Sequence, residues 1–410
     1  MKPEKDVKYI VMLGDGMADL PIDELGGKTP LAYADKPFMN HIANKGINGR
    51  VYTVPKSMKP ESDTANMCVM GFNPLVYATG RSPLEALSMG IDMKPDETAN
   101  RVNLVALSDK GEKYEDKIML DHSSDEIPSE EAKILIESIE DAFGDSIKRF
   151  YPGVSYRHCV IWKNCHTFDD YSRPHDIIGK KIGEYLPYKP ESKEIRDIMK
   201  RSFDILNTHP LNVDRAMRGL KKANSLWVWG PGKKPSLPDF KEKTGLSASV
   251  ICAVDLIKGI GLCAGMDAPF VFGATGTLDT NYHGKAEAAY NELKKGKDLV
   301  YIHVEAPDEC GHRGETENKV KSIEYIDREI LGYLMNKLDS DKTKYKILLL
   351  PDHPTPIAAR THTYDAVPFA IYKSYDKKDN DITVYDEKSG FDGGIVIEKG
   401  YELMDYFLNC

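Results

Sequence analysis

Residues 346–353 read KILLLPDH, an apolar run of strand length that stops at Asp352 and His353. An unbroken run of Ile and Leu, without polar alternation, is typical of a strand that is buried on both faces of a parallel sheet. Two residues of metal-ligand type follow that strand directly. Because open α/β sheets carry their sites at the carboxyl ends of the strands, this stretch predicts both a fold class and a site.

Other apolar runs repeat this arrangement. Residues 9–16 read YIVMLGDG and end near Asp15, and residues 301–312 read YIHVEAPDECGH and carry Asp308 and His312. A further imidazole, His362, ends the stretch AARTH. We predict strands at 9–13, 47–54, 226–230, 268–274, 298–306, 346–353 and 367–372, with helices between them. This order predicts a doubly wound, mostly parallel α/β sheet.

The texture of the chain changes between about residues 101 and 210. Strand-like RVNLVALS and VSYRHCVIWK alternate there with the helical patterns SSDEIPSEEAKILIESIEDAFG and SKEIRDIMKRSFDILNTH. We predict a smaller α+β domain at 101–210, inserted into a catalytic domain formed by 1–100 and 211–410.

Composition limits the classes of partner. The chain has 410 residues and a formal net charge of −9, which argues against nucleic acid or an anionic membrane as the main partner. Seven cysteines without a Cys-x-x-Cys pair fit a reducing compartment, and no apolar stretch approaches the length of a membrane span. We therefore expect a cytoplasmic protein that acts on a small molecule; its oligomeric state is not predicted.

The candidate ligands share one chemistry. Carboxylates and imidazoles, together with one hydroxyl, suit divalent ions that hold a phosphoryl group and its attacking oxygen. The hydroxyl is Ser62 in PESDTANM, which follows a loop and precedes a helical pattern. At the start of a helix, free N–H groups favour a phosphate or a forming alkoxide, so Ser62 is the predicted nucleophile. A simple helix cap is the alternative for Ser62, and a turn is the alternative for Asp15.

The spacing of Asp308 and His312 is one helical turn, which lets both side chains share an ion. Taken alone, such a pair is more often a surface or capping pair. Taken with the other ligands, it predicts a metal-dependent phosphoryl-transfer enzyme.

Motifs along nearly the whole chain resemble the cofactor-independent phosphoglycerate mutases of archaeal type, in the alkaline phosphatase superfamily. These motifs, in order, are GDGMAD, SDTANM, TGRSPLEALSMGI, YRH, PHDIIGK, ANSLWVWGPG, GATGTLDTNY, HVEAPDECGH, PDHPTP and THT. The resemblance implies an alkaline-phosphatase-like fold and the glycolytic interconversion of 3-phosphoglycerate and 2-phosphoglycerate through a phosphoserine, without bisphosphoglycerate.

The resemblance also implies two metal sites. One ion would be held by Asp15, Ser62, Asp352 and His353, and the other by Asp308, His312 and His362. Mn²⁺ is the first expected ion, with Mg²⁺, Co²⁺ and Zn²⁺ as alternatives. Cationic side chains must hold the phosphate and carboxylate of such a substrate. The candidates are Arg157, His175, Arg215, Arg218 and Lys258.

One segment departs from the family pattern. Similar mutases carry a basic residue where this chain has Glu126, in the stretch DHSSDEI, although His122 lies close by in sequence. This departure leaves open another phosphotransferase or phosphatase on the same scaffold, such as a homoserine-kinase-like activity. A non-catalytic phospho-ligand sensor is a hypothesis of another class, and the retained metal ligands and serine argue against it. The sequence contains no Walker-type phosphate loop, which argues against a nucleotide-dependent kinase.

Overall fold

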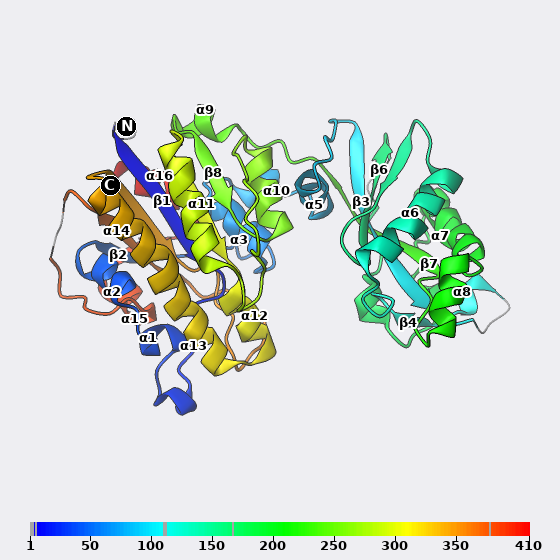
Figure 1. Ribbon diagram of the computed structural model, residues 1–410, viewed down its shortest axis with the longest axis horizontal. Coiled ribbons are helices and arrows are strands. Elements are labelled where there is room, and N and C mark those ends of the chain that lie inside the picture. The colour runs from blue at the N-terminus through cyan, green and yellow to red at the C-terminus, as the bar shows by residue number, and fades with distance from the viewer. Residues whose placement is uncertain (1–3, 5, 110–112, 166–167, 377–378) are drawn as a thin grey trace. The chain divides into compact units, whose positions relative to one another are not determined.

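The computed structural model describes residues 4, 6–109, 113–165, 168–376 and 379–410. The chain forms two compact units, the first from Met1–Ala78 and Ser236–Cys410 and the second from Thr79–Pro235 (Figure 1). The second unit includes the predicted insert at 101–210 and is longer at both ends. The extra length arises because helix α5 (Ser82–Ser88) and strand β7 (Ser225–Lys233) both pack on strand β3 (Glu97–Leu107).

The first unit contains a seven-stranded sheet in the order β12-β2-β11-β10-β1-β9-β8. Its strands are β1 (Val7–Gly14), β2 (Ile47–Val51), β8 (Ala248–Ile251), β9 (Leu299–Val304), β10 (Lys344–Leu350), β11 (Val367–Lys373) and β12 (Ile395–Ile397). The neighbours of β1 run parallel to it, whereas β11 runs antiparallel to both β10 and β2. The predicted mostly parallel α/β sheet is therefore confirmed.

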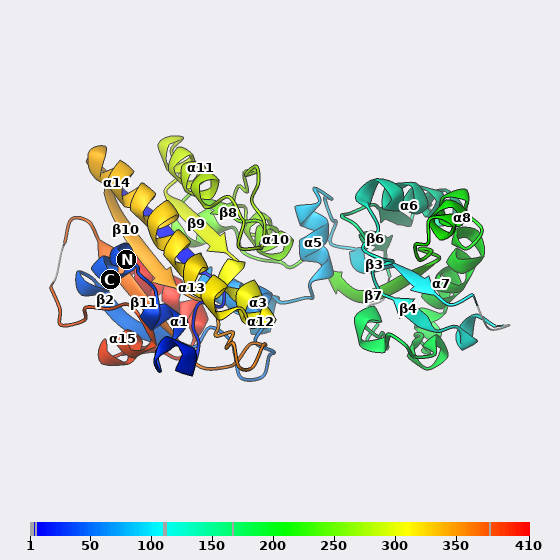
Figure 2. The same ribbon diagram turned by 60° about the horizontal axis from the view of Figure 1, so that its bottom comes forward.

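Helices cover both faces of this sheet (Figures 1 and 2). They are α1 (Pro30–Tyr33), α2 (Pro37–Asn44), α3 (Ser62–Val69), α4 (Pro74–Tyr77), α9 (Phe240–Thr244), α10 (Asp255–Cys263), α11 (Tyr282–Lys294), α12 (Ala306–Arg313), α13 (Thr316–Tyr325), α14 (Tyr333–Ser340), α15 (Glu387–Asp392) and α16 (Leu403–Asn409). Three short turns of helix complete the unit: η1 (Asp23–Leu25), the π-helical η6 (Ile326–Gly332) and η7 (Gly400–Glu402).

Alternation along the strands separates the two faces. Ile10 and Met12 of β1 join the core beneath α2, α11 and α14, while Tyr9 packs edge-on against Phe407 of α16. Tyr301 of β9 points to the same side as Tyr9, where its hydroxyl contacts α3. The helix that begins at Ser62 therefore lies on the face opposite the larger core.

The second unit contains a smaller sheet in which β3 pairs antiparallel with β4, β6 and β7. Its other strands are β4 (Met119–Asp121), β5 (Lys148–Tyr151) and β6 (Arg157–Lys163), and its helical elements are η2 (Tyr114–Asp116), α6 (Ser129–Phe143), η3 (Pro174–Ile177), η4 (Ile182–Tyr185), η5 (Pro190–Ser192), α7 (Lys193–Leu206) and α8 (Pro210–Met217). Leu135, Ile136 and Ile139 of α6 are buried at helical spacing against this sheet. The second unit therefore has the predicted α+β organisation of alternating strands and helices.

One predicted strand is wrong, and another lies in a different sheet from the predicted one. Residues 268–274 form a loop, in which Phe270 and Phe272 are 88% and 85% exposed. Residues 226–230 do form a strand, β7, but it belongs to the small sheet because it pairs along β3. An apolar run specifies a strand or a loop only together with its hydrogen-bonding neighbours, and those neighbours are distant in sequence.

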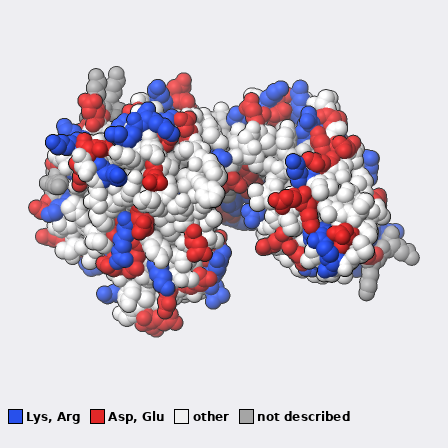
Figure 3. Space-filling view, viewed as in Figure 1, with Lys and Arg blue, Asp and Glu red and all other residues white. Residues whose placement is uncertain are grey.

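Surface charge, the cysteines and helix hydropathy bear on the classes of partner considered from the composition. Lys and Arg alternate with Asp and Glu on the visible face of both units (Figure 3). None of the seven cysteines, all of which lie in the described residues, forms a disulfide bond. Within the described residues, no helix is both long and apolar enough to span a membrane.

Candidate active site

The predicted ligands of the first unit come together at the carboxyl-terminal edge of the large sheet. Asp15 follows β1, and Asp352 and His353 follow β10. Asp308 and His312 lie on α12, which begins two residues after β9, and His362 lies in the loop before β11. Parallel strands with this order bring their carboxyl ends to one edge, which explains how residues so far apart in sequence meet.

One group of ligand atoms forms around His353. Side-chain atoms of Asp15, Asp352 and His353 lie within 4.8 Å of one another. The Nε2 atom of His353 lies 3.5 Å from both Asp15 Oδ1 and Asp352 Oδ2. All three side chains are buried, so a cation between them would be shielded from solvent.

Ser62 belongs to this group. It is the first residue of α3, and its Oγ lies 3.1 Å from His353 Nε2. The hydroxyl therefore lies at the positive end of a helix and beside the candidate ligands. Ser62 does not make a side-chain cap of α3, because the capping position belongs to Glu61.

A second group of ligand atoms forms around Asp308. The two carboxylate oxygens lie 3.2 Å from His312 Nε2 and 3.3 Å from His362 Nε2. The two Nε2 atoms are themselves 2.8 Å apart. The helical turn between Asp308 and His312 thus places both side chains on one side, as the spacing predicts. His353 stacks on His362 with ring centroids 3.8 Å apart and so adjoins both groups.

The pKa values of Asp15 and Asp308, the carboxylates of the two groups, are shifted in opposite directions. Burial and the neighbouring carboxylates of Asp352, Asp308 and Glu305 raise the pKa of Asp15 well above its ordinary value. Burial also acts to raise the pKa of Asp308, but hydrogen bonds from His312 and His362 outweigh it and hold that pKa well below the ordinary value. The same contact, against the effect of burial, raises the pKa of His312 to about 9.

The residues present fit divalent cations. Asp15 Oδ1 is buried and has no hydrogen-bond partner within the described residues, as expected of an atom that completes its coordination with a cation. His312 and His362 point their Nε2 atoms at each other and at one carboxylate, an arrangement that a cation would stabilise. Oxygen and imidazole ligands of this kind bind Mn²⁺, Mg²⁺, Co²⁺ or Zn²⁺.

Several supporting residues were not predicted from the sequence. Asn66 donates from Nδ2 to Asp352 Oδ2 at 2.9 Å and accepts from the Tyr301 hydroxyl at 2.7 Å. Thr355 donates to Asp308, and His303 contacts Asp15. Asn66 was detectable in principle, because it lies one helical turn after Ser62 on the same face.

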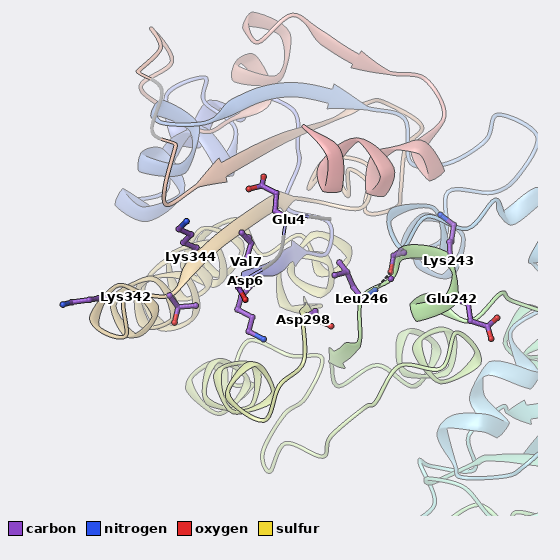
Figure 4. Close-up of a pocket in the computed structure, with 13 residues that line it drawn as sticks. Glu4, Asp6, Val7, Glu242, Lys243, Leu246, Asp298, Lys342 and Lys344 are labelled. Carbon is purple, nitrogen blue, oxygen red and sulfur yellow. Dashed lines mark hydrogen bonds between the residues drawn. The ribbon is translucent and has the colours of Figure 1, made fainter. Parts of the chain in front are cut away.

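A wide groove at the opposite, amino-terminal edge of the sheet is a different feature. It has a volume of about 1100 Å³ and is lined by the segments that begin β1 and β10 and that precede β8 and β9. Its labelled charged side chains, among them Glu4, Lys342 and Glu242, point in different directions (Figure 4). Both groups of candidate metal ligands found among the described residues lie elsewhere, so this groove does not compete with the site at the carboxyl ends.

Of the five predicted substrate-binding residues, only Lys258 lies in the first unit. It is half-buried on α10, which packs on α3. Arg157 and His175 lie in the second unit, in a group with His122, Tyr156 and Trp229 that we call the second-unit cluster. Arg157 lies 5.0 Å above the Tyr156 ring, and the His175 ring lies 6.0 Å from His122 and 6.1 Å from Trp229.

Both cationic and anionic side chains surround the histidines of the second-unit cluster, with Asp176 3.5 Å from His175 Nε2. The pKa of His175 is lowered by burial first, and then by the charges of His122, Arg173 and Arg101, against the opposing effect of Asp176. Burial thus favours the neutral His175 ring, which can still donate or accept a hydrogen bond.

Arg215 and Arg218 are engaged within the second unit. Arg215 is 1% exposed, and its three nitrogens donate to Lys221 O, Glu131 and Ser124 O. Arg218 pairs with Glu131 at 2.7 Å and with Asp214 at 2.9 Å. These contacts satisfy the Arg215 guanidinium internally, which favours a structural role over the predicted contact with substrate.

Comparisons with known proteins agree on one family. The family model described as 2,3-bisphosphoglycerate-independent phosphoglycerate mutase matches residues 43–212. The chain is 46% identical over 400 residues to the enzyme of that name from Methanosarcina barkeri, covering 97% of this chain and 98% of that protein. It is 44% identical over 403 residues to the probable enzyme of that name from Geobacter sulfurreducens, covering 98% and 100%.

Solved structures share the fold. A protein from Pyrococcus horikoshii superposes with a TM-score of 0.82 at 27% identity, over 98% of this chain and 97% of that one. A cofactor-independent phosphoglycerate mutase from Thermoplasma acidophilum superposes with a TM-score of 0.65 at 24% identity, over 98% and 99%. The architecture of both units is therefore that of a known fold.

Proposed function

The chain belongs to the 2,3-bisphosphoglycerate-independent phosphoglycerate mutase family, and we propose that it interconverts 3-phosphoglycerate and 2-phosphoglycerate through a phosphoserine at Ser62. One observation carries the proposal: the Ser62 hydroxyl lies at the start of α3, 3.1 Å from His353, beside the buried group of Asp15 and Asp352. A hydroxyl in such surroundings is an activated nucleophile.

We assign two cations to the two groups of ligand atoms. Asp15, Ser62, Asp352 and His353 would hold one, and Asp308, His312 and His362 the other, with Mn²⁺ as the expected ion. Bound there, the cations would favour the ionised form of the Ser62 hydroxyl and neutralise charge on the phosphoryl oxygens.

The residues of the chain then carry the transfer. Ser62 Oγ forms a bond to phosphorus as the bond from phosphorus to the substrate hydroxyl oxygen breaks, and that oxygen leaves as the free hydroxyl of glycerate after taking up a proton. The N-terminal turn of α3 stabilises the equatorial oxygens with its N–H groups. Glycerate remains bound and reorients, and its other hydroxyl attacks the phosphoserine, which releases Ser62 and the isomeric product.

The second-unit cluster is our proposed site for the anionic ends of the substrate. Arg157 is exposed, and it offers planar donors that match a carboxylate. His122 and His175 lie beside Arg157 and offer ring nitrogens that can hydrogen-bond to the substrate. We also propose that the second unit acts as the lid of the enzyme, because water must be kept from the phosphoserine if glycerate is to retrieve the phosphoryl group.

The position of Glu126 gives no reason to propose a phosphoryl acceptor other than phosphoglycerate. It is an exposed residue with φ of +49°, and its backbone N–H contacts the Ser123 hydroxyl at 3.3 Å. His122, four residues earlier, lies in the cluster with Arg157 and His175. A small phosphorylated carboxylate is therefore the substrate class that we propose, and a cytoplasmic location stays a prediction.

An enolase-coupled assay tests the proposal. Purified protein with Mn²⁺ and 3-phosphoglycerate, without bisphosphoglycerate, should form 2-phosphoglycerate. Ser62→Ala should bind Mn²⁺ and lose on the order of four decades of turnover, as expected when a covalent nucleophile is removed. Ser138→Ala, which changes a serine on α6 of the second unit, is the matched control and should be fully active.

Two results would contradict the proposal. Substantial turnover by Ser62→Ala would exclude covalent catalysis through that hydroxyl. Wild-type protein that binds Mn²⁺, forms no 2-phosphoglycerate and consumes ATP only with homoserine would instead identify a kinase on this scaffold.

A further inference from the structure

Strand β9 carries a polar side chain that the proposed mechanism has not used. His303 is fully buried, two residues after Tyr301, so both side chains project from the same face of the strand. Val300, Ile302 and Val304 face the large core on the other side. Burial of an imidazole in a strand is unfavourable unless the ring is hydrogen-bonded, so the partner of the ring is the question that follows.

Among the described residues, the ring of His303 contacts Asp15. Its Nε2 lies 3.1 Å from Asp15 Oδ2, while its Nδ1 is buried and has no partner within the described part of the chain. The backbone at this position is also fixed, because the buried Lys285 ammonium donates to His303 O at 3.1 Å. The imidazole is thus held at the strand end with one nitrogen directed at Asp15.

The two buried carboxylates next to Ser62 are fixed in different ways. Asp352 accepts from Gly16 N, His353 N and Asn66 Nδ2, so backbone and side chain together determine its orientation. Asp15 lacks such a set of donors among the described residues: His303 contacts Oδ2, and Oδ1 lies 3.5 Å from His353. The orientation of Asp15 depends on the histidine.

We propose that His303 is a positioning residue that holds Asp15 Oδ2, and so leaves Oδ1 as the single Asp15 atom that faces the candidate cation. The ring carries its proton on Nε2 and donates it to the carboxylate. Outer partners of this kind orient metal ligands, and their loss weakens metal binding by about 10- to 100-fold.

This inference rests on the cation site of the proposed function, but not on the substrate. Its test is Mn²⁺ binding to the full-length protein, followed by the free-ion signal in electron paramagnetic resonance, in the wild type, His303→Gln and His303→Asn. The terminal amide nitrogen of Gln reaches the position of Nε2, whereas that of Asn ends near Nδ1. Comparing the Gln and Asn variants therefore distinguishes loss of the hydrogen bond to Asp15 from a general change in side-chain polarity.

We expect two Mn²⁺ ions to bind to the wild type. His303→Asn should weaken one of them by about 10- to 100-fold and leave the other unchanged, whereas His303→Gln should retain most of the affinity. If the Asn variant does not fold, His303→Met, which fills similar space without a donor, should show the same loss. Thermal unfolding without cation serves as the control for general damage.

Each other result has one meaning. Two unchanged affinities in the Asn or Met variant, or Gln as weak as Asn, would overturn the role of His303 alone. Equal loss at both sites together with a lower unfolding temperature would show a purely structural residue. A wild type that binds no Mn²⁺ would overturn the inference and the cation sites together, whereas normal binding without mutase activity would leave the inference standing and remove the proposed reaction.

Discussion

The two units place their functional side chains in opposite ways. In the first unit, the candidate ligands are mostly buried at strand ends, and carboxylates such as Asp352 and Asp308 have several hydrogen-bond partners. In the second unit, Arg157 is exposed and its guanidinium lies 5.0 Å from the centre of the Tyr156 ring. Buried and fixed ligands suit reaction chemistry, because they need no reorganisation when charge develops, whereas an exposed arginine suits capture of a substrate.

The largest expected effect would come from breaking the fixed site. Asp308→Asn removes the carboxylate that both His312 and His362 contact. Since loss of an outer partner alone weakens metal binding by about 10- to 100-fold, loss of this ligand should exceed that range and remove one of two Mn²⁺ ions. Calorimetric titration with Mn²⁺ measures the stoichiometry.

The matched control is Glu309→Gln, which changes the next carboxylate on α12, paired with Arg313 on the surface. It should bind both ions with unchanged affinity. An Asp308→Asn protein that still binds two ions with wild-type affinity would remove Asp308 from the site.

A second test separates structural from exposed arginines within the second unit. Arg215→Met should lower the free energy of unfolding by about 3 kcal/mol, because it leaves Glu131 and two carbonyl oxygens without their buried donor. Arg218→Met, at the exposed pair, should have little effect. The three tryptophans all lie in the second unit, at 162, 227 and 229, so fluorescence during urea unfolding reports this unit alone.

Equal stability of the two variants would show that the buried contacts of Arg215 contribute nothing net. A raised KM in Arg215→Met without a loss of stability would restore the role that the sequence predicts for Arg215.

The exposed arginine should affect substrate and leave the metal site unchanged. Arg157→Met should raise the KM for 3-phosphoglycerate by about 10- to 100-fold, the expected loss for a hydrogen bond to a charged group, with unchanged Mn²⁺ affinity. Arg201→Met is the matched control, since Arg201 also lies above an aromatic ring, 4.8 Å from the centroid of Phe143. Identical KM values in the two variants would remove Arg157 from substrate binding.

The same contrast explains what could be predicted from the sequence. The candidate ligands were recognisable because each follows an apolar strand or lies one helical turn from another ligand, and both patterns are local. Arg215 and Arg157 look alike in sequence, and only the partner Glu131, 84 residues before Arg215, distinguishes them. His303 was missed for a related reason: inside an apolar strand, its contact with Asp15 depends on the pairing of β9 with β1.

For the fold too, local patterns could be predicted from the sequence and long-range pairing could not. Continuous apolar runs identified the parallel strands of the large sheet, which are buried on both faces. The run at 226–230 was assigned to the wrong sheet, because its register with β3 is a long-range property. The run at 268–274 has no strand partner within the described residues and forms a loop.

The smallest expected effect concerns His158, a buried histidine of the second unit that has no charged partner among the described residues. Burial lowers the pKa of His158 to about 3, and its Nδ1 accepts a hydrogen bond from Gly153 N at 3.0 Å. In the unfolded chain, an ordinary imidazole has a pKa of about 6.5. Below about pH 6.5 the unfolded state therefore binds a proton that the folded state does not, and stability falls as the pH falls toward 3, by up to about 1.4 kcal/mol for each pH unit.

His158→Asn tests this, because the Asn Oδ1 can accept from Gly153 N while the titrating group is gone. Urea unfolding followed by tryptophan fluorescence at about pH 7, 6 and 5 should give a shallower loss of stability in the variant than in the wild type. At about pH 7 the protonation of His158 should contribute least to the free energy of unfolding, because the side chain is then mostly neutral in both the folded and the unfolded state. Parallel pH profiles for the two proteins would show that His158 takes up its proton equally in the folded and unfolded chain, and would remove the contrast with the first unit, where Asp308 raises the pKa of His312 to about 9.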